Sequence, residues 1–199
     1  MKPVLAVFDF DGTITRKDTL LEFIRFACGS SAFLRGFALY APILVLMKLH
    51  LYPNWKAKQQ VFTHFFGGMP QKDFNAICAR FCERRFDRLV YADAKERIRQ
   101  HLAKGEQVAI VSASPENWVS LFAERLGITT TLATQLEIKD GRLTGRFASK
   151  NCYGQEKVNR ILERFPNREE YTLIAYGDSN GDKHMLAFAD QGFYKLFTK

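Results

Sequence analysis

The sequence predicts an α/β fold, with a mostly parallel β-sheet flanked by helices and an all-helical segment inserted after the first strand. Three observations predict it. The apolar run at residues 4–8 is typical of a strand buried on both faces. Residues 18–104 show helical spacing and no clear strand pattern. From residue 107 onward, strand-like and helix-like segments alternate, which favours parallel strands joined by crossover helices.

The inserted segment divides into several helices. Leu20, Phe23 and Ile24 have the spacing of an amphipathic helix over residues 19–28, and Gly29 can end it. Glycines also separate the helices that follow. These are expected at residues 54–66, 70–89 and 92–104, with breaks at Gly67-Gly68 and Gly105. We therefore expect two domains, a core formed by residues 1–15 and 90–199 and a helical cap formed by residues 16–89.

The most apolar part of the cap runs from residue 33 to residue 52. Its uncharged stretch between Arg35 and Lys48 has 12 residues. A helix needs about 20 apolar residues to cross a bilayer, so we expect this segment to be too short to span one. Two interpretations stay open: a buried helix kinked at Pro42, or a helix that lies in a membrane interface.

The second half of the chain supplies the remaining strands and helices. Residues 107–112 and 171–177 read as buried strands, and residues 192–197 read as a last one. Residues 131–147 resemble a hairpin that turns at Asp140-Gly141. The helices between them are expected at residues 115–126 and 155–165, with a short one near Asp182. In Ser114-Pro115-Glu116 we expect a serine cap, a proline at the first helical position and an acid in the first turn.

Composition limits the class of protein. Apolar residues make up 47% of the chain and charged residues 25%, as in ordinary globular proteins. The first residues show no signal-peptide pattern, so we expect a cytoplasmic protein, with peripheral contact at the inner face of the membrane as an alternative. Between residues 16 and 89, 12 Lys and Arg stand against five Asp and Glu, so most of the net charge of +8 lies in the cap. Such a segment could face an anionic substrate, a membrane surface or nucleic acid.

Polar residues follow the predicted core strands. Asp9 and Asp11 end the first strand, Ser112 ends the second, and residues 177–182 (GDSNGD) end the third. Lys157 lies in the first turns of the helix before that third strand. Ligands of parallel sheets bind at the carboxyl ends of the strands, so these groups are expected to meet there. Carboxylates with a hydroxyl and an ammonium group suit a hard cation and a phosphate.

These motifs, in this order, resemble those of the haloacid dehalogenase superfamily: DFDGT, the serine of VSAS, the lysine of YGQEKVNR and GDSNGD. The resemblance covers the whole chain, and a helical insertion after the first motif resembles the C1 caps of subfamily IB, near phosphoserine phosphatase. It implies a Rossmann-like core and a Mg²⁺-dependent phosphomonoesterase. Phosphatidylglycerophosphate phosphatases of the same subfamily provide an alternative, because the apolar, basic cap resembles theirs.

The resemblance also implies roles for single residues. Asp9 would be the nucleophile that forms an aspartyl-phosphate, and Asp11 would protonate the leaving alcohol and later accept a proton from water. Asp9, the backbone carbonyl of Asp11 and Asp178 would hold Mg²⁺, and Asp182 would hold the water molecules of the metal or orient Lys157. The phosphate would be bound by Gly12, Ser112, Ala113 and Lys157.

The substrate is less clearly indicated. Glu22 and Arg25 are candidates for the charged groups of an amino acid, and Asn180 is a third candidate for substrate contact. A small ester such as phosphoserine and a lipid headgroup phosphate both remain open. A third hypothesis is a binding module without enzymatic activity, in which the basic cap binds an anionic surface and the carboxylates hold a metal. Nucleic acid is not expected, because the basic segment lacks the aromatic motifs of known RNA-binding folds. The scattered cysteines, which form no C-x-x-C pair, are expected to be mostly inert: Cys28, Cys78, Cys82 and Cys152.

Overall fold

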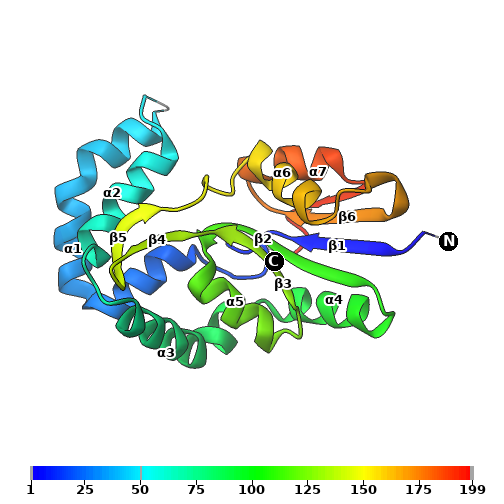
Figure 1. Cartoon of the computed structure of the whole chain (residues 1–199), viewed down its shortest axis with the longest axis horizontal. Coiled ribbons are helices and arrows are strands. Elements are labelled where there is room, and N and C mark those ends of the chain that lie inside the picture. The colour runs from blue at the N-terminus through cyan, green and yellow to red at the C-terminus, as the bar shows by residue number, and fades with distance from the viewer. Residues whose placement is uncertain (1, 50, 198–199) are drawn as a thin grey trace.

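The computed structural model describes residues 2–49 and 51–197, and a five-stranded parallel sheet forms its centre (Figure 1). The strand order is β3-β2-β1-β6-β7, and every neighbouring pair is parallel. The strands are β1 (Val4–Phe8), β2 (Gln107–Pro115), β3 (Thr130–Thr134), β6 (Thr172–Gly177) and β7 (Gln191–Tyr194). The predicted α/β class is confirmed.

Helices cover both faces of this sheet. One face carries α4 (Ala92–Ala103) and α5 (Glu116–Arg125), and the other carries α6 (Gln155–Arg164) and α7 (Lys183–Phe188) (Figure 1). Side chains alternate between the faces along a strand, so each buried strand must be apolar throughout. In β1, Ala6 and Phe8 belong to one buried cluster, and Leu5 and Val7 belong to the other. Two short 3₁₀ helices at Arg168–Glu170 and Asn180–Asp182 flank β6.

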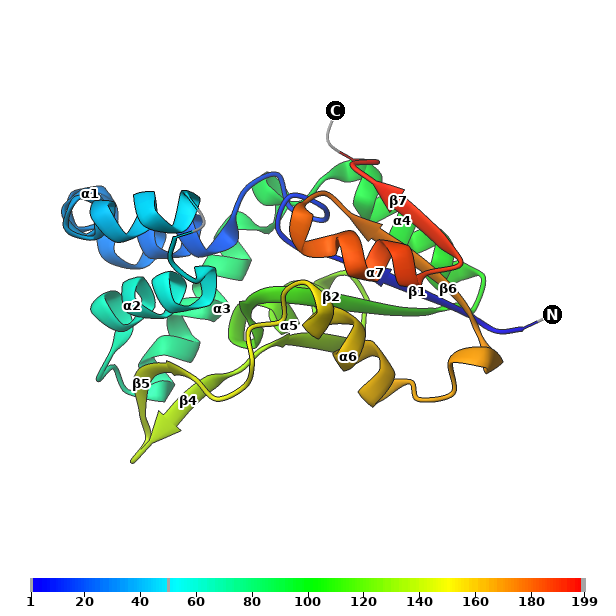
Figure 2. The same ribbon diagram turned by 90° about the horizontal axis from the view of Figure 1, so that it is seen from above.

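Three helices inserted after β1 stack at one end of the molecule (Figure 2). They are α1 (Thr19–Lys48), α2 (Asn54–Phe66) and α3 (Gln71–Leu89). The predicted break at Gly29 is present, since its φ of 81° and ψ of 163° are the non-helical dihedral angles inside α1. Pro42 lies inside the helix beyond that break and keeps helical dihedral angles. The break in α1 is therefore at Gly29 and not at Pro42.

Aromatic side chains join these helices to the sheet domain. Phe23 of α1 stacks on Trp118 of α5 at a centroid distance of 4.6 Å, and both side chains are fully buried. Phe66, Phe74 and Phe81 surround Phe23 at centroid distances of 5.3–5.4 Å. The cluster continues without interruption to the α4 and α5 face of the sheet. One apolar cluster thus contains side chains from residues 16–89 and from the rest of the chain. Packing does not separate the two parts, so the division into a core and a cap stays a prediction.

The predicted hairpin is shorter than expected. It consists of β4 (Leu136–Lys139) and β5 (Arg142–Phe147) and turns at Asp140-Gly141 as predicted. The preceding residues 130–134 instead form β3, the edge strand of the parallel sheet beside β2. The hairpin hydrogen-bonds to the inserted helical segment, where the backbone of Leu143 pairs with Gly68 and Met69 at 2.7 and 2.9 Å. A local alternation of residue types cannot show which neighbouring strand a segment will pair with.

The second half of α1 lies on the outside of the molecule. Phe33 and Gly36 are its buried residues, and a Cβ on Gly36 would lie 2.3 Å from the Phe65 ring of α2, so the two helices approach closely there. By length and composition α1 could cross a bilayer, and 11% of its apolar window is buried. The core helix of a soluble protein can meet the same criteria, so the prediction that the segment is too short to cross a bilayer stays a prediction.

Candidate active site

The carboxyl ends of β1, β2 and β6 meet at the side of the sheet that faces α1 and α2, where a cavity of about 350 Å³ opens. Side chains from both parts of the chain line it. Five of the lining residues are aspartates: Asp9, Asp11, Asp18, Asp178 and Asp182. Four of these follow β1 or β6, as the sequence predicts for a site at the strand ends.

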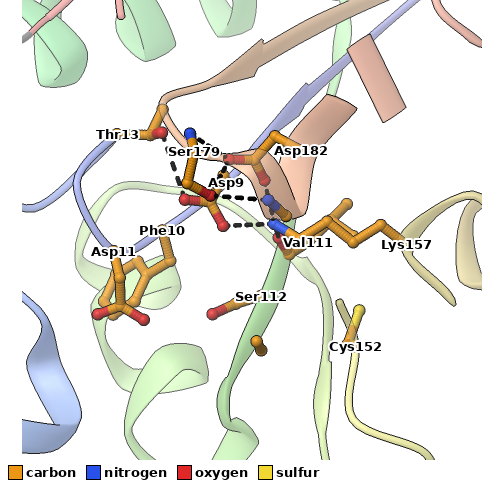
Figure 3. A network of polar contacts seen from close by, with 12 residues as sticks. Asp9, Phe10, Asp11, Thr13, Val111, Ser112, Cys152, Lys157, Ser179 and Asp182 are labelled. Carbon is orange, nitrogen blue, oxygen red and sulfur yellow. Dashed lines mark hydrogen bonds and ion pairs between the residues drawn. The ribbon is translucent and has the colours of Figure 1, made fainter. Parts of the chain in front are cut away.

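Lys157 is the buried cation at the centre of this group (Figure 3). Its side chain is 2% exposed, and its ammonium group hydrogen-bonds to Asp9 Oδ1, to Asp182 Oδ1 at 2.7 Å and to the carbonyl of Val111 at 2.9 Å. The ammonium group has three donors, and these three acceptors use all of them. Lys150, the nearby lysine on the loop before α6, is exposed.

Burial and this ion pair shift the pKa of each partner. Burial raises the pKa of Asp9 to about 7, although the neighbouring Lys157 acts in the opposite direction. Burial also opposes ionisation of Asp182, but Lys157 and hydrogen bonds from Ser179 hold its pKa below the ordinary value. The pKa of Lys157 is raised, because attraction to the two carboxylates exceeds the effect of burial. Asp182 and Lys157 therefore remain charged, and Asp9 has the most easily changed charge of the three.

Asp182 is already supplied with hydrogen-bond donors. Its Oδ2 accepts from the backbone N–H groups of Asp178 and Ser179 at 3.1 and 2.9 Å, and from the Ser179 hydroxyl at 2.8 Å. Its Oδ1 accepts from Lys157. Because Ser179 also caps the short helix at Asn180–Asp182, this carboxylate fixes the shape of the loop after β6.

Three carboxylates at the strand ends suit a divalent cation. Oxygens of Asp9, Asp178 and Asp182 lie within 4.8 Å of one another, and hard cations prefer carboxylate ligands. Gly12 keeps this space open, since a Cβ there would lie 2.3 Å from Asp178 Oδ2. The Thr13 hydroxyl lies 3.3 Å from Asp9 Oδ2 and 3.4 Å from Asp178 Oδ1, which brings these two oxygens together. The arrangement therefore fits a metal held by Asp9 and Asp178, with Asp182 behind them.

Asp11 points away from the Asp9–Lys157 pair (Figure 3). Its Oδ1 accepts hydrogen bonds from the backbone N–H and the hydroxyl of Thr19, at 2.7 and 2.6 Å, and its Oδ2 accepts one from the Ser114 hydroxyl at 2.5 Å. Burial raises the pKa of Asp11, and the hydrogen bonds from Ser114 and Thr19 lower it. Two partners separated by about a hundred residues in the sequence thus hold this carboxylate.

The prediction for Ser114 is wrong. Helix α5 begins at Glu116 with Pro115 as its N-cap, and no side chain caps it. The Ser114 side chain is 1% exposed and binds Asp11 instead. Strand β2 extends to Pro115, which carries Ser114 into the site rather than into a helix cap.

The residues predicted to bind phosphate lie around Asp9. Gly12, Ala113 and Lys157 line the cavity. Ser112 is fully buried, and its hydroxyl oxygen accepts a hydrogen bond from the Ser114 N–H at 3.0 Å. No acceptor for the Ser112 hydroxyl proton is found among the residues that the structure describes.

The structure does not bring the three predicted substrate contacts to the described wall of the cavity. Glu22 forms ion pairs with Lys17 and Arg25 at 3.1 and 3.6 Å, and Asn180 lies in the 3₁₀ turn after β6. Residues that the sequence analysis did not single out line the cavity instead: Arg16, Lys17, Asp18, Lys58 and Tyr153. The excess of basic residues in the cap was the available signal for three of them.

Comparisons with known proteins identify the family of this chain. The family model described as haloacid dehalogenase-like hydrolase matches residues 6–187. Protein CicA of Caulobacter vibrioides is 34% identical over 197 residues, which cover 98% of this chain and 87% of that protein. Probable phosphatase Rv3661 of Mycobacterium tuberculosis is 32% identical over 189 residues, covering 91% of this chain and 64% of that protein. A substrate-bound phosphoserine phosphatase has a similar fold, with a TM-score of 0.67 and 23% identity over 98% of this chain and 85% of that one.

Proposed function

We propose that this chain, which belongs to the haloacid dehalogenase-like hydrolases, hydrolyses a small phosphate monoester through a phosphorylated Asp9. The enzyme is a phosphatase similar to phosphoserine phosphatases. One observation carries the more specific proposal: the buried Lys157 pairs with Asp9 and Asp182 beside Asp178, at the wall of an open cavity. Two further points argue against a binding module without enzymatic activity. The chain is similar to phosphatases, and it has Asp11, a general acid that a binding module would not need.

The proposed bond changes use the two carboxylates to which the family resemblance assigns these roles. An oxygen of Asp9 attacks phosphorus, the bond from phosphorus to the leaving oxygen breaks, and Asp11 donates a proton to that oxygen. Water then attacks the aspartyl-phosphate, Asp11 accepts a proton from it, and inorganic phosphate leaves with the Asp9 carboxylate restored. Lys157 offsets negative charge on Asp9 and on the phosphoryl group, and the unshared Ser112 proton is available to a phosphoryl oxygen.

Asp9, Asp178 and the backbone carbonyl of Asp11 would hold Mg²⁺, whose charge would reduce the repulsion between the carboxylate and the phosphate. Asp182 would act from behind, by fixing the Asp178 loop and Lys157. We assign residues 1–15 and 90–199 to the catalytic core and residues 16–89 to the cap, which would contact the leaving group.

Three basic residues on the cap side of the cavity support a substrate with a second anionic group. Arg16, Lys17 and Lys58 line the cavity and come from the cap side of the predicted boundary. Lys58 is close enough to Asp11 for its charge to lower the pKa of that carboxyl. A phosphorylated amino acid such as phosphoserine carries a carboxylate that could meet these cations. Such a substrate would be found in the cytoplasm, where we also place the enzyme.

The test is phosphate release in the presence of Mg²⁺ from a panel of esters. The panel contains phosphoserine, histidinol phosphate, sugar phosphates, nucleoside monophosphates and, in mixed micelles, phosphatidylglycerophosphate. We expect a soluble ester to be preferred, no turnover by Asp9→Asn, and no turnover in excess EDTA. Asn has almost the same shape but is a far weaker nucleophile. Near-native hydrolysis by a folded Asp9→Asn chain would remove Asp9 as the nucleophile.

A second candidate, a phosphatase acting on lipid headgroups, is favoured by one specific observation. Four apolar residues on the second half of α1 are exposed, and three more follow in the adjoining loop and the start of α2. We call this set the apolar outer face: Leu34, Leu39, Val45, Leu46, Leu49, Leu51 and Trp55. Exposed Arg35, Lys48 and Lys56 lie among them in the sequence. Near an anionic bilayer each such cation contributes about 1 kcal/mol of binding free energy.

Flotation with vesicles separates the two candidates. If the lipid candidate holds, the chain floats with phosphatidylglycerol vesicles and not with phosphatidylcholine vesicles. A variant with Leu34, Leu39 and Leu46 all changed to Gln should then lose binding while keeping its activity on a soluble aryl phosphate. Leu196→Gln, at an exposed leucine outside the cap, is the matched control. No flotation of the wild-type chain would eliminate the lipid candidate.

A further inference from the structure

Asp11 is held by a chain of hydrogen bonds that starts at a tryptophan on α5 and passes through the first residue of α1. Trp118, on α5 of the sheet domain, donates from Nε1 to the Thr19 hydroxyl at 3.0 Å. Thr19 is the first residue of α1, and both its backbone N–H and its hydroxyl reach Asp11 Oδ1. Thr19 and Trp118 are fully buried. Water therefore does not compete for these bonds.

The direction of each hydrogen bond is fixed by the chemistry of the groups. An indole N–H can only donate, so the Thr19 hydroxyl accepts from Trp118 and must direct its own proton elsewhere. The Asp11 Oδ1 atom, at 2.6 Å, receives it. A backbone N–H also can only donate, so Oδ1 accepts two hydrogen bonds with one possible polarity. An oxygen surrounded in this way is unsuited to carrying a proton itself.

The other oxygen of Asp11 has a different environment. Its partner is the Ser114 hydroxyl, at 2.5 Å, and a hydroxyl can donate or accept. When Oδ2 carries a proton, Ser114 can accept from it and turn its own proton toward Thr19 Oγ1, which lies 3.5 Å away. Both forms of the carboxyl group are then hydrogen-bonded without movement of a heavy atom. The two oxygens of Asp11 therefore differ in what they can do.

We propose that Thr19 and Trp118 are positioning residues for catalysis, which anchor Asp11 by Oδ1 and leave Oδ2 as the oxygen that exchanges the proton. Trp118 is itself fixed, since its ring stacks on Phe23 of α1. Because Thr19 begins α1, the placement of the first cap helix determines the orientation of the acid. The inference rests on the proposed function, in which Asp11 protonates the leaving group.

The experiment compares two esters of nearly the same shape, phenyl phosphate and p-nitrophenyl phosphate, with Mg²⁺ present. Nitrophenolate leaves without a proton far more readily than phenolate, so loss of the acid harms cleavage of phenyl phosphate more. The readout is the ratio of kcat/KM for p-nitrophenyl phosphate to kcat/KM for phenyl phosphate. A general loss of structure lowers both values and leaves their ratio unchanged.

Five variants, among them Asp11→Asn, are compared with the wild-type chain after their melting curves show that they fold. Thr19→Val removes the hydroxyl at constant shape, and Thr19→Ser retains it. Trp118→Phe removes the indole N–H and provides a second route if Thr19→Val does not fold. Thr15→Val is the matched control, because Thr15 is also fully buried and its hydroxyl bonds to the carbonyls of Phe10 and Lys17 rather than to Asp11.

We expect Thr19→Val to raise the ratio at least about threefold, Trp118→Phe to raise it less, and Thr19→Ser and Thr15→Val to leave it unchanged. Asp11→Asn should raise it by about tenfold or more, as expected for loss of a general acid. An unchanged ratio in Thr19→Val or Trp118→Phe, when Asp11→Asn raises it, would overturn the positioning role. An equal rise in Thr15→Val would do the same. An unchanged ratio in Asp11→Asn would instead contradict the proposed function.

Discussion

Two regions of this molecule reverse the usual distribution of side chains, in opposite ways. At the strand ends, Asp9, Lys157 and Asp182 are charged groups that are almost completely buried. On the apolar outer face of α1, Leu34 and Leu39 are each 65% exposed. Unpaired buried charges are costly for a folded chain, and large exposed apolar patches are rare on soluble monomers. Each therefore indicates a role that stability alone does not explain.

The difference between the two regions lies in how completely each is compensated within the chain. Lys157 uses its three donors on three acceptors, and Asp182 accepts from four donors. The leucines of the outer face have no comparable compensation in the part of the chain that the structure describes. The role of the buried charged group can therefore be argued from its own geometry. The role of the exposed apolar face requires an experiment that supplies a partner for it.

The largest effect is expected from removing the buried cation. Lys157→Met leaves Asp9 and Asp182 facing each other without a positive charge, and breaking such a buried pair typically costs about 3–5 kcal/mol. We expect the free energy of unfolding in urea to fall by about this amount in EDTA, where no metal can replace the lost charge. Activity should be lost as well.

Lys150→Met is the control for that prediction. Lys150 is exposed on the loop before α6, so its removal should change the free energy of unfolding by no more than about 0.5 kcal/mol. Equal losses in the two variants would show that the Lys157 pair does not stabilise the fold, and the contrast between the two regions would then fail.

The sequence allowed much of the fold and of the strand-end group to be predicted. Strand β1 and helix α2 have the predicted bounds, and Gly29 breaks α1 as expected, because apolar spacing and glycine act locally. Asp9, Lys157 and Asp182 meet because parallel strands bring their carboxyl ends to one edge. The parallel arrangement of the strands predicts where these residues meet, and the motifs identify which residues they are.

Contacts between distant segments could not be predicted in the same way. Ser114 was interpreted from its neighbours as a helix cap, whereas its partner is Asp11, 103 residues away. In the sequence, Thr19 and Trp118 look like ordinary helix residues. They are 99 residues apart and meet only because the fold brings α1 and α5 together. Glu22 has a suitable place in the sequence, but its side chain pairs with Lys17 and Arg25 and does not line the cavity. Periodicity fixes the face of a helix and not its neighbour.

The smallest effect is expected on the apolar outer face. Leu39→Gln keeps the helix propensity of α1 and removes no buried contact, so the free energy of unfolding should change by no more than about 0.5 kcal/mol. Phe23→Ala, at a fully buried position of the same helix, should cost about 3–5 kcal/mol and provides the comparison. Urea unfolding at two protein concentrations measures both. A loss above about 1 kcal/mol for Leu39→Gln that grows with protein concentration would mean that a second copy covers this face in solution. The two regions would then no longer be opposites, because each would be compensated by protein.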